Sequence, residues 1–143
     1  MKSIRSRKAG VAVIEAGIRQ RDQVGDRTLS AFSRILLAEI YIRLLHGSRK
    51  ASWSIIIKNL PFLLGAKLFG ARKARALLEA AAAHRQFSAD GVVAARIVLN
   101  LGLLAQRKGD AAAARDCRQR ALQIANEQRD APLLRRIESE LLV

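Results

Sequence analysis

Apolar and small residues recur at helical spacing along most of this chain, and one pattern occurs three times. Residues 10–26, 74–90 and 114–130 align without gaps, with a small residue first, another seven residues later and an aspartate at the end. Since seven residues make about two turns of an α-helix, the small residues of each segment lie on one face. The pattern predicts three equivalent helices that approach a neighbouring helix there. The small residues are Gly10 and Gly17, Ala74 and Ala81, and Ala114 and Ala121, and the aspartates are Asp26, Asp90 and Asp130.

The sequences after the first two aspartates also match each other. Twelve residues beyond each aspartate lies a small residue preceded by leucine, which is Ala38 in one copy and Gly102 in the other. Gly17 and Ala38 are 21 residues apart, and so are Ala81 and Gly102. We interpret the repeated unit as two antiparallel helices, A and B, that cross at their small residues. Close packing at this crossing explains Gly102, although glycine costs about 1 kcal/mol relative to alanine in a helix interior.

Local signals place the helix ends. The aspartates that end the three segments are expected to open A helices, because aspartate is a favoured N-cap. Gly109 is expected to close one A helix, and Asp110 to cap the B helix that follows. That B helix is predicted over about 111–128, and the next helix begins near Pro132, which suits a first turn.

Residues 99–122 resemble a tetratricopeptide repeat (TPR). In that repeat a Leu-Gly pair on helix A is followed, after a turn, by Ala-x3-aromatic-x2-Ala-Leu on helix B. Leu101 and Gly102 match the first part, and Ala114, Ala121 and Leu122 match the second. The sequence departs from the repeat at its usual aromatic positions, which hold Arg34, Val98, Ala105 and Arg118.

The repeat is also longer than the standard one. Ala81 and Ala121 are 40 residues apart, against about 34 in a TPR. Longer, degenerate repeats of this kind are similar to the C-terminal helical arrays of bacterial class III adenylate and guanylate cyclases and of related signal-transduction ATPase regulators. Residues 58–81 resemble segments of those tails.

This resemblance implies an all-α fold in which antiparallel helix hairpins stack as a short, right-handed, TPR-like solenoid. It implies a single domain over residues 1–143 that is the C-terminal fragment of a longer regulator. An ordinary helical bundle is the alternative fold. The sequence contains no cyclase catalytic domain and no G-x-x-x-x-G-K-[ST] phosphate-binding loop, so the enzymatic activity of that family is not expected.

A segment at about 47–71 is inserted into the repeat. Ala38 and Ala74 are 36 residues apart, where the later copy needs only 12 from Gly102 to Ala114. The extra segment is predicted to be helical and contains Trp53, Phe62 and Phe69 among basic residues. Two roles are open: a hairpin that covers the edge of the array, or an element that docks on a partner or a lipid surface.

The net charge of +14 and the pI of about 11.5 allow binding to nucleic acid, anionic lipid or an acidic protein. Arginine supplies 19 of the 26 basic residues, so the charge can also reflect an arginine-rich composition without a function. The basic residues are spread along the chain instead of forming one block.

The remaining features predict a soluble, cytoplasmic protein. Cys117 is the only cysteine, which fits a reducing compartment. Glu15 interrupts the apolar run near the start, which makes a poor signal peptide. Residues 53–70 are apolar but contain Lys58, Pro61 and Lys67, so no transmembrane segment is expected.

No catalytic or metal-binding constellation stands out. His46 and His84 are far apart and lack cysteine or acidic residues at ligand spacing. Glu15 and Glu79 are equivalent repeat positions, not an acid–base pair. We therefore expect no enzyme activity, no metal and no cofactor.

The leading functional hypothesis is a non-catalytic protein–protein interaction module. Solenoids present a concave face lined by their A helices, and a basic face favours acidic peptides or carboxylate ends. Two alternatives stay open: a structural or regulatory remnant of a cyclase or ATPase regulator, and a module that binds nucleic acid or an anionic surface through its arginines. The residues predicted to contact a partner are Arg27, Arg34, Tyr41, Arg96 and Asn100.

Overall fold

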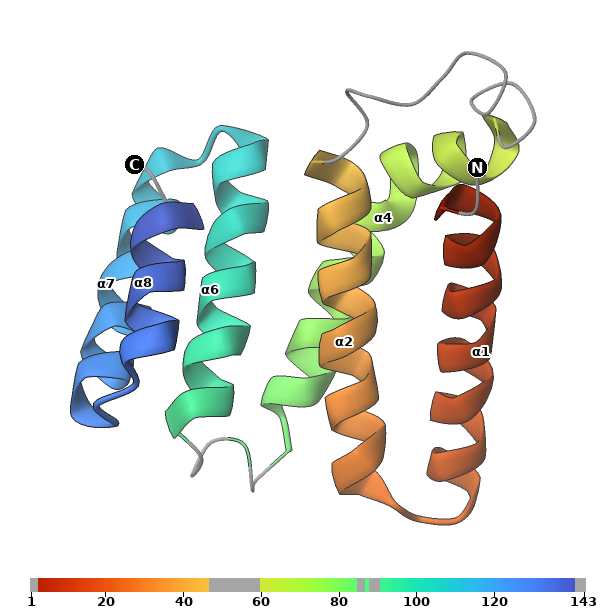
Figure 1. Ribbon diagram of the computed structural model, residues 1–143, viewed down its shortest axis with the longest axis horizontal. Coiled ribbons are helices and arrows are strands. Elements are labelled where there is room, and N and C mark those ends of the chain that lie inside the picture. Colours follow the sequence, from red (N-terminus) through yellow and green to blue (C-terminus); the bar gives the residue numbers. More distant parts are fainter. Residues whose placement is uncertain (1–2, 47–59, 85–86, 88–90, 141–143) are drawn as a thin grey trace. The chain divides into compact units, whose positions relative to one another are not determined.

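The computed structural model describes residues 3–46, 60–84, 87 and 91–140. These residues form six α-helices and no strand, which confirms the predicted all-α class (Figure 1). The chain divides into two compact units, residues 1–77 (unit 1) and residues 78–143 (unit 2), and the boundary falls within one helix. The single repeat domain and its solenoid arrangement stay predictions. The helices are α1 (Ser3–Gln23), α2 (Arg27–His46), α4 (Leu60–Ala82), α6 (Gly91–Lys108), α7 (Ala111–Glu127) and α8 (Ala131–Glu140).

Unit 1 is built around α2. The helices α1 and α2 form an antiparallel hairpin (Figure 1). α4 approaches the C-terminal half of α2, where a Cβ atom on Gly70 would lie 3.6 Å from the side chains of Tyr41 and Leu45. A helix that is apolar on nearly every side is one that its neighbours surround. The buried apolar residues of α2 are Ala31, Ile35, Leu37, Ala38, Tyr41, Ile42, Leu44 and Leu45.

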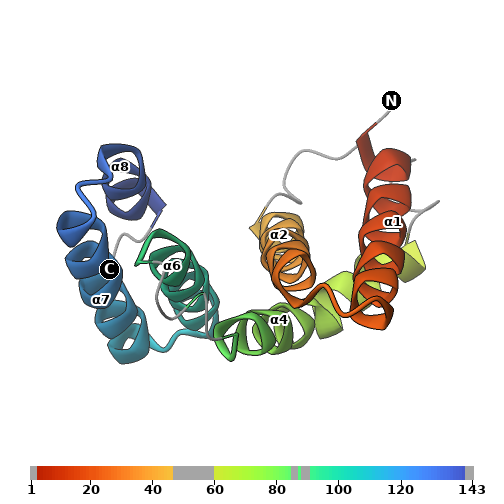
Figure 2. The same cartoon turned by 90° about the horizontal axis from the view of Figure 1, so that it is seen from below.

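Unit 2 contains three consecutive helices that pack on one another, α6, α7 and α8 (Figure 2). The middle helix, α7, buries only small side chains, Ala114, Ala121 and Ala125. Alanines at this spacing form one face and let a neighbouring helix approach closely. Gly102 on α6 is buried too, as the predicted crossing requires.

The turns of the described hairpins share one hydrogen-bond pattern. At the end of α6, the N–H of Gly109 donates to Gln106 O at 3.1 Å, and the N–H of Asp110 donates to Ala105 O at 3.0 Å. This pair of bonds is a Schellman motif. The same two bonds end α1 and α7. The residue in the left-handed conformation is Gly25, Gly109 or Arg129, with φ of 78°, 83° and 53°.

The aspartate of each turn caps the next helix. Asp26, Asp110 and Asp130 each accept a hydrogen bond from the backbone N–H three residues ahead, at 3.1, 3.1 and 2.9 Å. These caps confirm the prediction, and α7 ends within one residue of its predicted bound. Pro132 lies in the first turn of α8, also as predicted. Asp90 lies outside the described residues.

The first copy of the repeat differs from the prediction. A Cβ atom on Gly10 would meet nothing within 4 Å, and one on Gly17 would meet only Nη1 of Arg21 at 3.2 Å. These glycines therefore do not mark a close crossing. The residues that follow them, Val11 and Ile18, are the buried ones, so the apolar stripe of α1 is shifted by one position. In the later copies Ala74, Ala81, Ala114 and Ala121 are fully buried, as is Ala38 on α2.

The predicted insertion is described only in part. Its residues 47–59 lie outside the described part of the chain, and residues 60–71 belong to α4. The B helix expected to begin near Ala74 therefore starts at Leu60, with Pro61 in its first turn. Among the described residues, no helix has both the length and the apolar character needed to cross a membrane.

Candidate interaction surface

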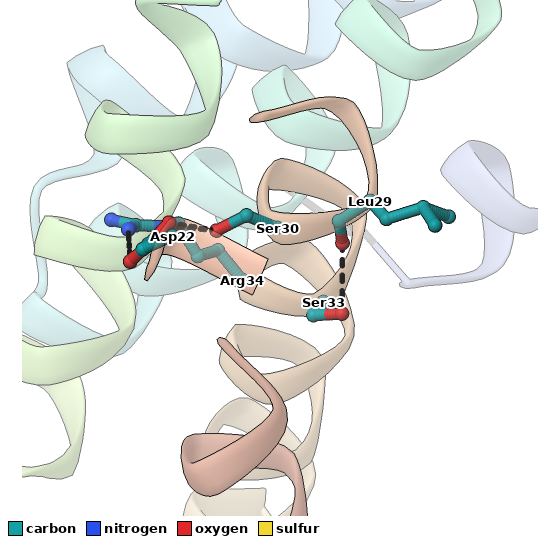
Figure 3. A network of polar contacts seen from close by, with 5 residues as sticks. All are labelled: Asp22, Leu29, Ser30, Ser33 and Arg34. Atoms are coloured by element: carbon teal, nitrogen blue, oxygen red, sulfur yellow. Dashed lines mark hydrogen bonds and ion pairs between the residues drawn. The ribbon is translucent and has the colours of Figure 1, made fainter. Parts of the chain in front are cut away.

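A polar clamp joins the end of α1 to the start of α2. The carboxylate of Asp22 accepts a hydrogen bond from the hydroxyl of Ser30 at 2.5 Å and pairs with Nη2 of Arg34 at 2.7 Å (Figure 3). Nε of Arg34 also donates to the Ser30 hydroxyl, at 3.4 Å. Arg34 is one of the predicted partner-binding residues, and its first role in the structure is to hold this hairpin.

A second bridge lies beside the clamp. Nη1 of Arg21 donates to the hydroxyl of Ser33 at 2.8 Å, and that hydroxyl donates to Leu29 O at 2.8 Å (Figure 3 shows the second bond). Together the two networks fix the first two turns of α2 against the last turn of α1. Neither network could be predicted from the sequence, because serine and arginine in a helix give no spacing signal of their own.

Tyr41 does not line a surface. Its side chain is 5% exposed, and its hydroxyl donates to Oε1 of Glu15 at 3.2 Å. Nζ of Lys73 on α4 lies 5.8 Å from the centre of its ring, within cation–π range. Burial, the charge of Glu15 and this hydrogen bond raise the pKa of Tyr41 to about 12. Tyr41 is therefore a shared contact of α1, α2 and α4.

Asn100 on α6 is likewise internal. It is 1% exposed, and its Nδ2 donates to Arg96 O at 2.9 Å in the preceding turn. A buried amide must be hydrogen-bonded, because leaving it unsatisfied costs free energy. Of the five predicted partner-binding residues, only Arg27 is exposed, while Arg34 and Arg96 are partly exposed.

The structure brings together the predicted positions that share a helix. Arg27 and Arg34 lie two turns apart on one side of α2, and Tyr41 follows two turns later, facing inward. Arg96 and Asn100 lie one turn apart on α6, in unit 2. The periodicity identified the helices correctly but not which of their sides are covered.

The division into units shows that the charge is concentrated after all. Residues 1–77 contain 16 Lys and Arg and four Asp and Glu, a formal net charge of +12, whereas residues 78–143 contain 10 and eight, a net charge of +2. The basic residues occur in both units, as expected, but the net charge is not shared evenly between them. Unit 1 has six more bases and four fewer acids than unit 2, and together these make the difference of ten in net charge.

The acids of unit 1 are all engaged within the protein. Glu15 accepts from Tyr41, Asp22 belongs to the clamp, and Asp26 caps α2. The fourth, Glu39, is buried. Among the described side chains of unit 1, six cations are exposed against one exposed acid, Asp22, which is paired with Arg34. The exposed cations among its described side chains are Arg19, Arg27, Arg43, Arg72, Lys73 and Arg75.

One face of α4 combines cations with large apolar side chains. Leu68 is 70% exposed and Phe69 57% exposed, whereas Gly70 and Ala74 on the opposite side are buried. We call the exposed side the α4 outer face. The sequence placed Phe69 in the inserted segment at about 47–71, for which docking on a partner or a lipid surface was one of two open roles, but the exposed side continues beyond that segment to Ala76. Its residues are Leu68, Phe69, Arg72, Lys73, Arg75 and Ala76.

The described residues contain no group of three His, Cys, Asp or Glu that could hold a metal ion. The ring of His84 packs on Phe87 with their centroids 5.2 Å apart. Cys117 is partly buried on α7. The side chain of His46 lies outside the described part.

Comparisons with known proteins give no relative: no family model, no curated protein and no solved structure matches this chain.

Proposed function

We propose that this protein is a non-catalytic interaction module, built of TPR-like helix hairpins, that binds an acidic protein segment through unit 1. The observation that carries the proposal is the cationic surface of that unit. Its net charge is +12, and each of its four carboxylates is capping a helix, paired, hydrogen-bonded or buried. A surface whose cations are not neutralised by neighbouring acids attracts and orients an anionic partner.

The repeated turns support the hairpin part of the proposal. Schellman motifs followed by aspartate caps join α1 to α2, α6 to α7 and α7 to α8. In a helical repeat the same turn must recur, because each hairpin has to direct the next helix in an equivalent way. We therefore assign α2 and α6 to the A position and α1, α4 and α7 to the B position.

The start of α2 is the best-placed contact. Arg27 is exposed, and Arg34 follows seven residues later on the same side with its side chain 28% exposed. Their Cα atoms are about 10 Å apart at the rise of an α-helix. A guanidinium carries five N–H donors, so the pairing of Arg34 with Asp22 does not exhaust it. Two arginines at this distance suit carboxylates two turns apart on an acidic helix, or about three residues apart in an extended acidic segment.

Binding of a fluorescein-labelled glutamate-rich peptide, followed by fluorescence polarisation, tests the proposal. Arg27→Glu is expected to weaken binding by about threefold or more, since an exposed ion pair is lost and a repulsion is gained. Arg120→Glu, an exposed position on α7 in unit 2, changes the net charge equally and is the control. Equal effects of the two variants, or no binding at low salt, would contradict the proposal.

Nucleic acid is the competing partner that the same charge favours. Two results together would identify the partner as nucleic acid. Duplex DNA would displace the peptide, and the affinity for DNA would fall steeply and linearly in a plot of log K against log salt. A shallow salt dependence and weak competition by DNA are expected if the partner is an acidic protein.

A further inference from the structure

The α4 outer face carries both apolar and cationic side chains on one side of the helix. At about 100° per residue, Arg75, Leu68, Arg72, Ala76, Phe69 and Lys73 follow one another around roughly 160° of the helix. All six are exposed. Between residues 68 and 76 this arc combines apolar and cationic side chains and contains no acid, and the exposed Glu79 lies on the same side of α4 one turn further along.

Between Leu68 and Ala76, α4 has its small side chains inward and its large apolar ones outward, although the next turn buries Leu78. The inward side carries Gly70 and Ala74, while the larger Leu68 and Phe69 point outward. Exposed leucine and phenylalanine side chains are favourably removed from water, so Leu68 and Phe69 together on one side of a helix indicate an interaction site. The close approach of Gly70 to Tyr41 and Leu45 fixes which side of α4 faces outward.

We propose that the α4 outer face docks on an anionic lipid membrane. Leu68 and Phe69 would enter the boundary between headgroups and acyl chains, and the long side chains of Arg72 and Arg75 would reach lipid phosphates and carboxylates. The charge is complementary, because unit 1 carries +12 and its carboxylates are engaged internally. This surface is separate from the start of α2, so the inference goes beyond the proposed peptide binding.

A membrane satisfies both kinds of side chain at once. A nucleic acid or a purely acidic peptide would pair with the cations but leave Leu68 in water, because an aliphatic side chain gains nothing from phosphates or carboxylates. Phe69 alone could stack on a base. An anionic bilayer offers a negative surface with an apolar phase directly beneath it.

Flotation of the full-length protein with vesicles tests the inference. Binding is expected to phosphatidylcholine vesicles that contain phosphatidylserine, and not to phosphatidylcholine alone. The double variant Leu68→Ser with Phe69→Ser should lower the partition coefficient about tenfold or more. Arg72→Glu with Arg75→Glu should lower it by about fivefold for each cation removed. Arg115→Glu with Arg120→Glu, at exposed positions of α7, changes the net charge equally and should have the smaller effect.

The apolar variant separates this inference from the proposed function. Leu68→Ser with Phe69→Ser should lose vesicle binding but keep the affinity for the glutamate-rich peptide and the melting temperature, because both positions are exposed. Vesicle binding that survives this variant would overturn the membrane inference. The inference would also fail if duplex DNA abolished vesicle binding of the wild type and the variant bound DNA as tightly as the wild type does. Absence of binding to phosphatidylserine vesicles at low salt would overturn it as well. Loss of peptide binding by Arg27→Glu bears only on the proposed function.

Discussion

Tyr41 shows how one side chain can join three helices and report on all of them. It is buried on α2, donates to Glu15 on α1 and lies beneath the ammonium group of Lys73 on α4. Since it is the only tyrosine of the chain, its ionisation can be followed without assignment. It therefore provides a direct probe of whether unit 1 is folded as described.

The phenol of Tyr41 should lose its proton at a higher pH than the phenol of an exposed tyrosine. Burial, together with Glu15, raises the pKa of Tyr41 to about 12 in the folded protein, against about 10 in an unfolded chain. Because the folded pKa is the higher one, the stability linked to this proton is fully present below pH 10 and is lost as the pH rises through about 12. The near-ultraviolet absorbance of the tyrosinate, recorded against pH in buffer and in urea, measures the pKa of Tyr41 in the folded and in the unfolded protein. A single value of about 10 in both solvents would show that Tyr41 is exposed.

Arg129 is the one residue of the three turns that lacks the expected glycine. Its φ is 53°, whereas Gly25 and Gly109 adopt 78° and 83° at equivalent positions. A side chain in the left-handed region costs about 1–2 kcal/mol, part of which is offset by the lower entropy of a non-glycine residue when unfolded.

Arg129→Gly should therefore stabilise the protein by about 0.5–1 kcal/mol, although it removes an exposed cation. Gly109→Ala should act in the opposite direction by about 1 kcal/mol, because it places a Cβ atom in the same conformation. Urea denaturation followed by circular dichroism measures both. A loss of stability in Arg129→Gly would mean that its side chain contributes more than its backbone costs.

At the scale of elements, the contact between α6 and α7 depends on small residues. Gly102 is buried on α6, and Ala114, Ala121 and Ala125 form the buried face of α7. Gly102→Leu should destabilise the protein by about 1–3 kcal/mol, because a large side chain forces packed helices apart. The melting temperature measures the effect, and Ala112→Leu, at an exposed position of α7, serves as the control. An unchanged melting temperature for Gly102→Leu would refute the hairpin register.

The sequence predicted best what is determined locally. Gly109, Asp110 and Asp130 end and begin helices through bonds to residues within five positions, so their roles could be read without any tertiary information. Burial depends on neighbours instead. α2 and α6 are apolar on most sides, and helical periodicity cannot show which side of such a helix stays open. For that reason Tyr41 and Asn100 were expected at a surface and lie inside.

For a related reason, the sequence could not decide whether the segment around Phe69 covers the array or docks on a partner or a lipid surface. Its inner contacts are made by Gly70 and Ala74, which give no apolar signal, whereas Leu68 and Phe69 suggest a core. Only the packing of Gly70 against Tyr41 reverses that interpretation. The clamp of Asp22, Ser30 and Arg34 was equally invisible, because it joins residues on two helices.

At the scale of the whole molecule, charge distinguishes the two units more clearly than fold does. Both consist of helices, but their net charges are +12 and +2 over chains of comparable length. A surface potential depends on the local density of uncompensated charge, not on the total for the chain. Two variants of equal net charge should therefore bind a negatively charged surface with different strength, depending on which unit carries the substitutions.

Retention on a cation-exchange matrix tests this directly and needs no biological partner. Arg19→Glu with Arg43→Glu in unit 1, and Arg115→Glu with Arg120→Glu in unit 2, each lower the net charge of +14 by four, and all four positions are exposed. Because the matrix binds the face of highest positive potential, the unit 1 pair should shift elution to lower salt by at least about twice as much as the unit 2 pair. Matching melting temperatures would show that neither pair disturbs the fold. Equal shifts would mean that the +12 of unit 1 is not presented as one surface, and the partner would then have to be sought elsewhere on the molecule.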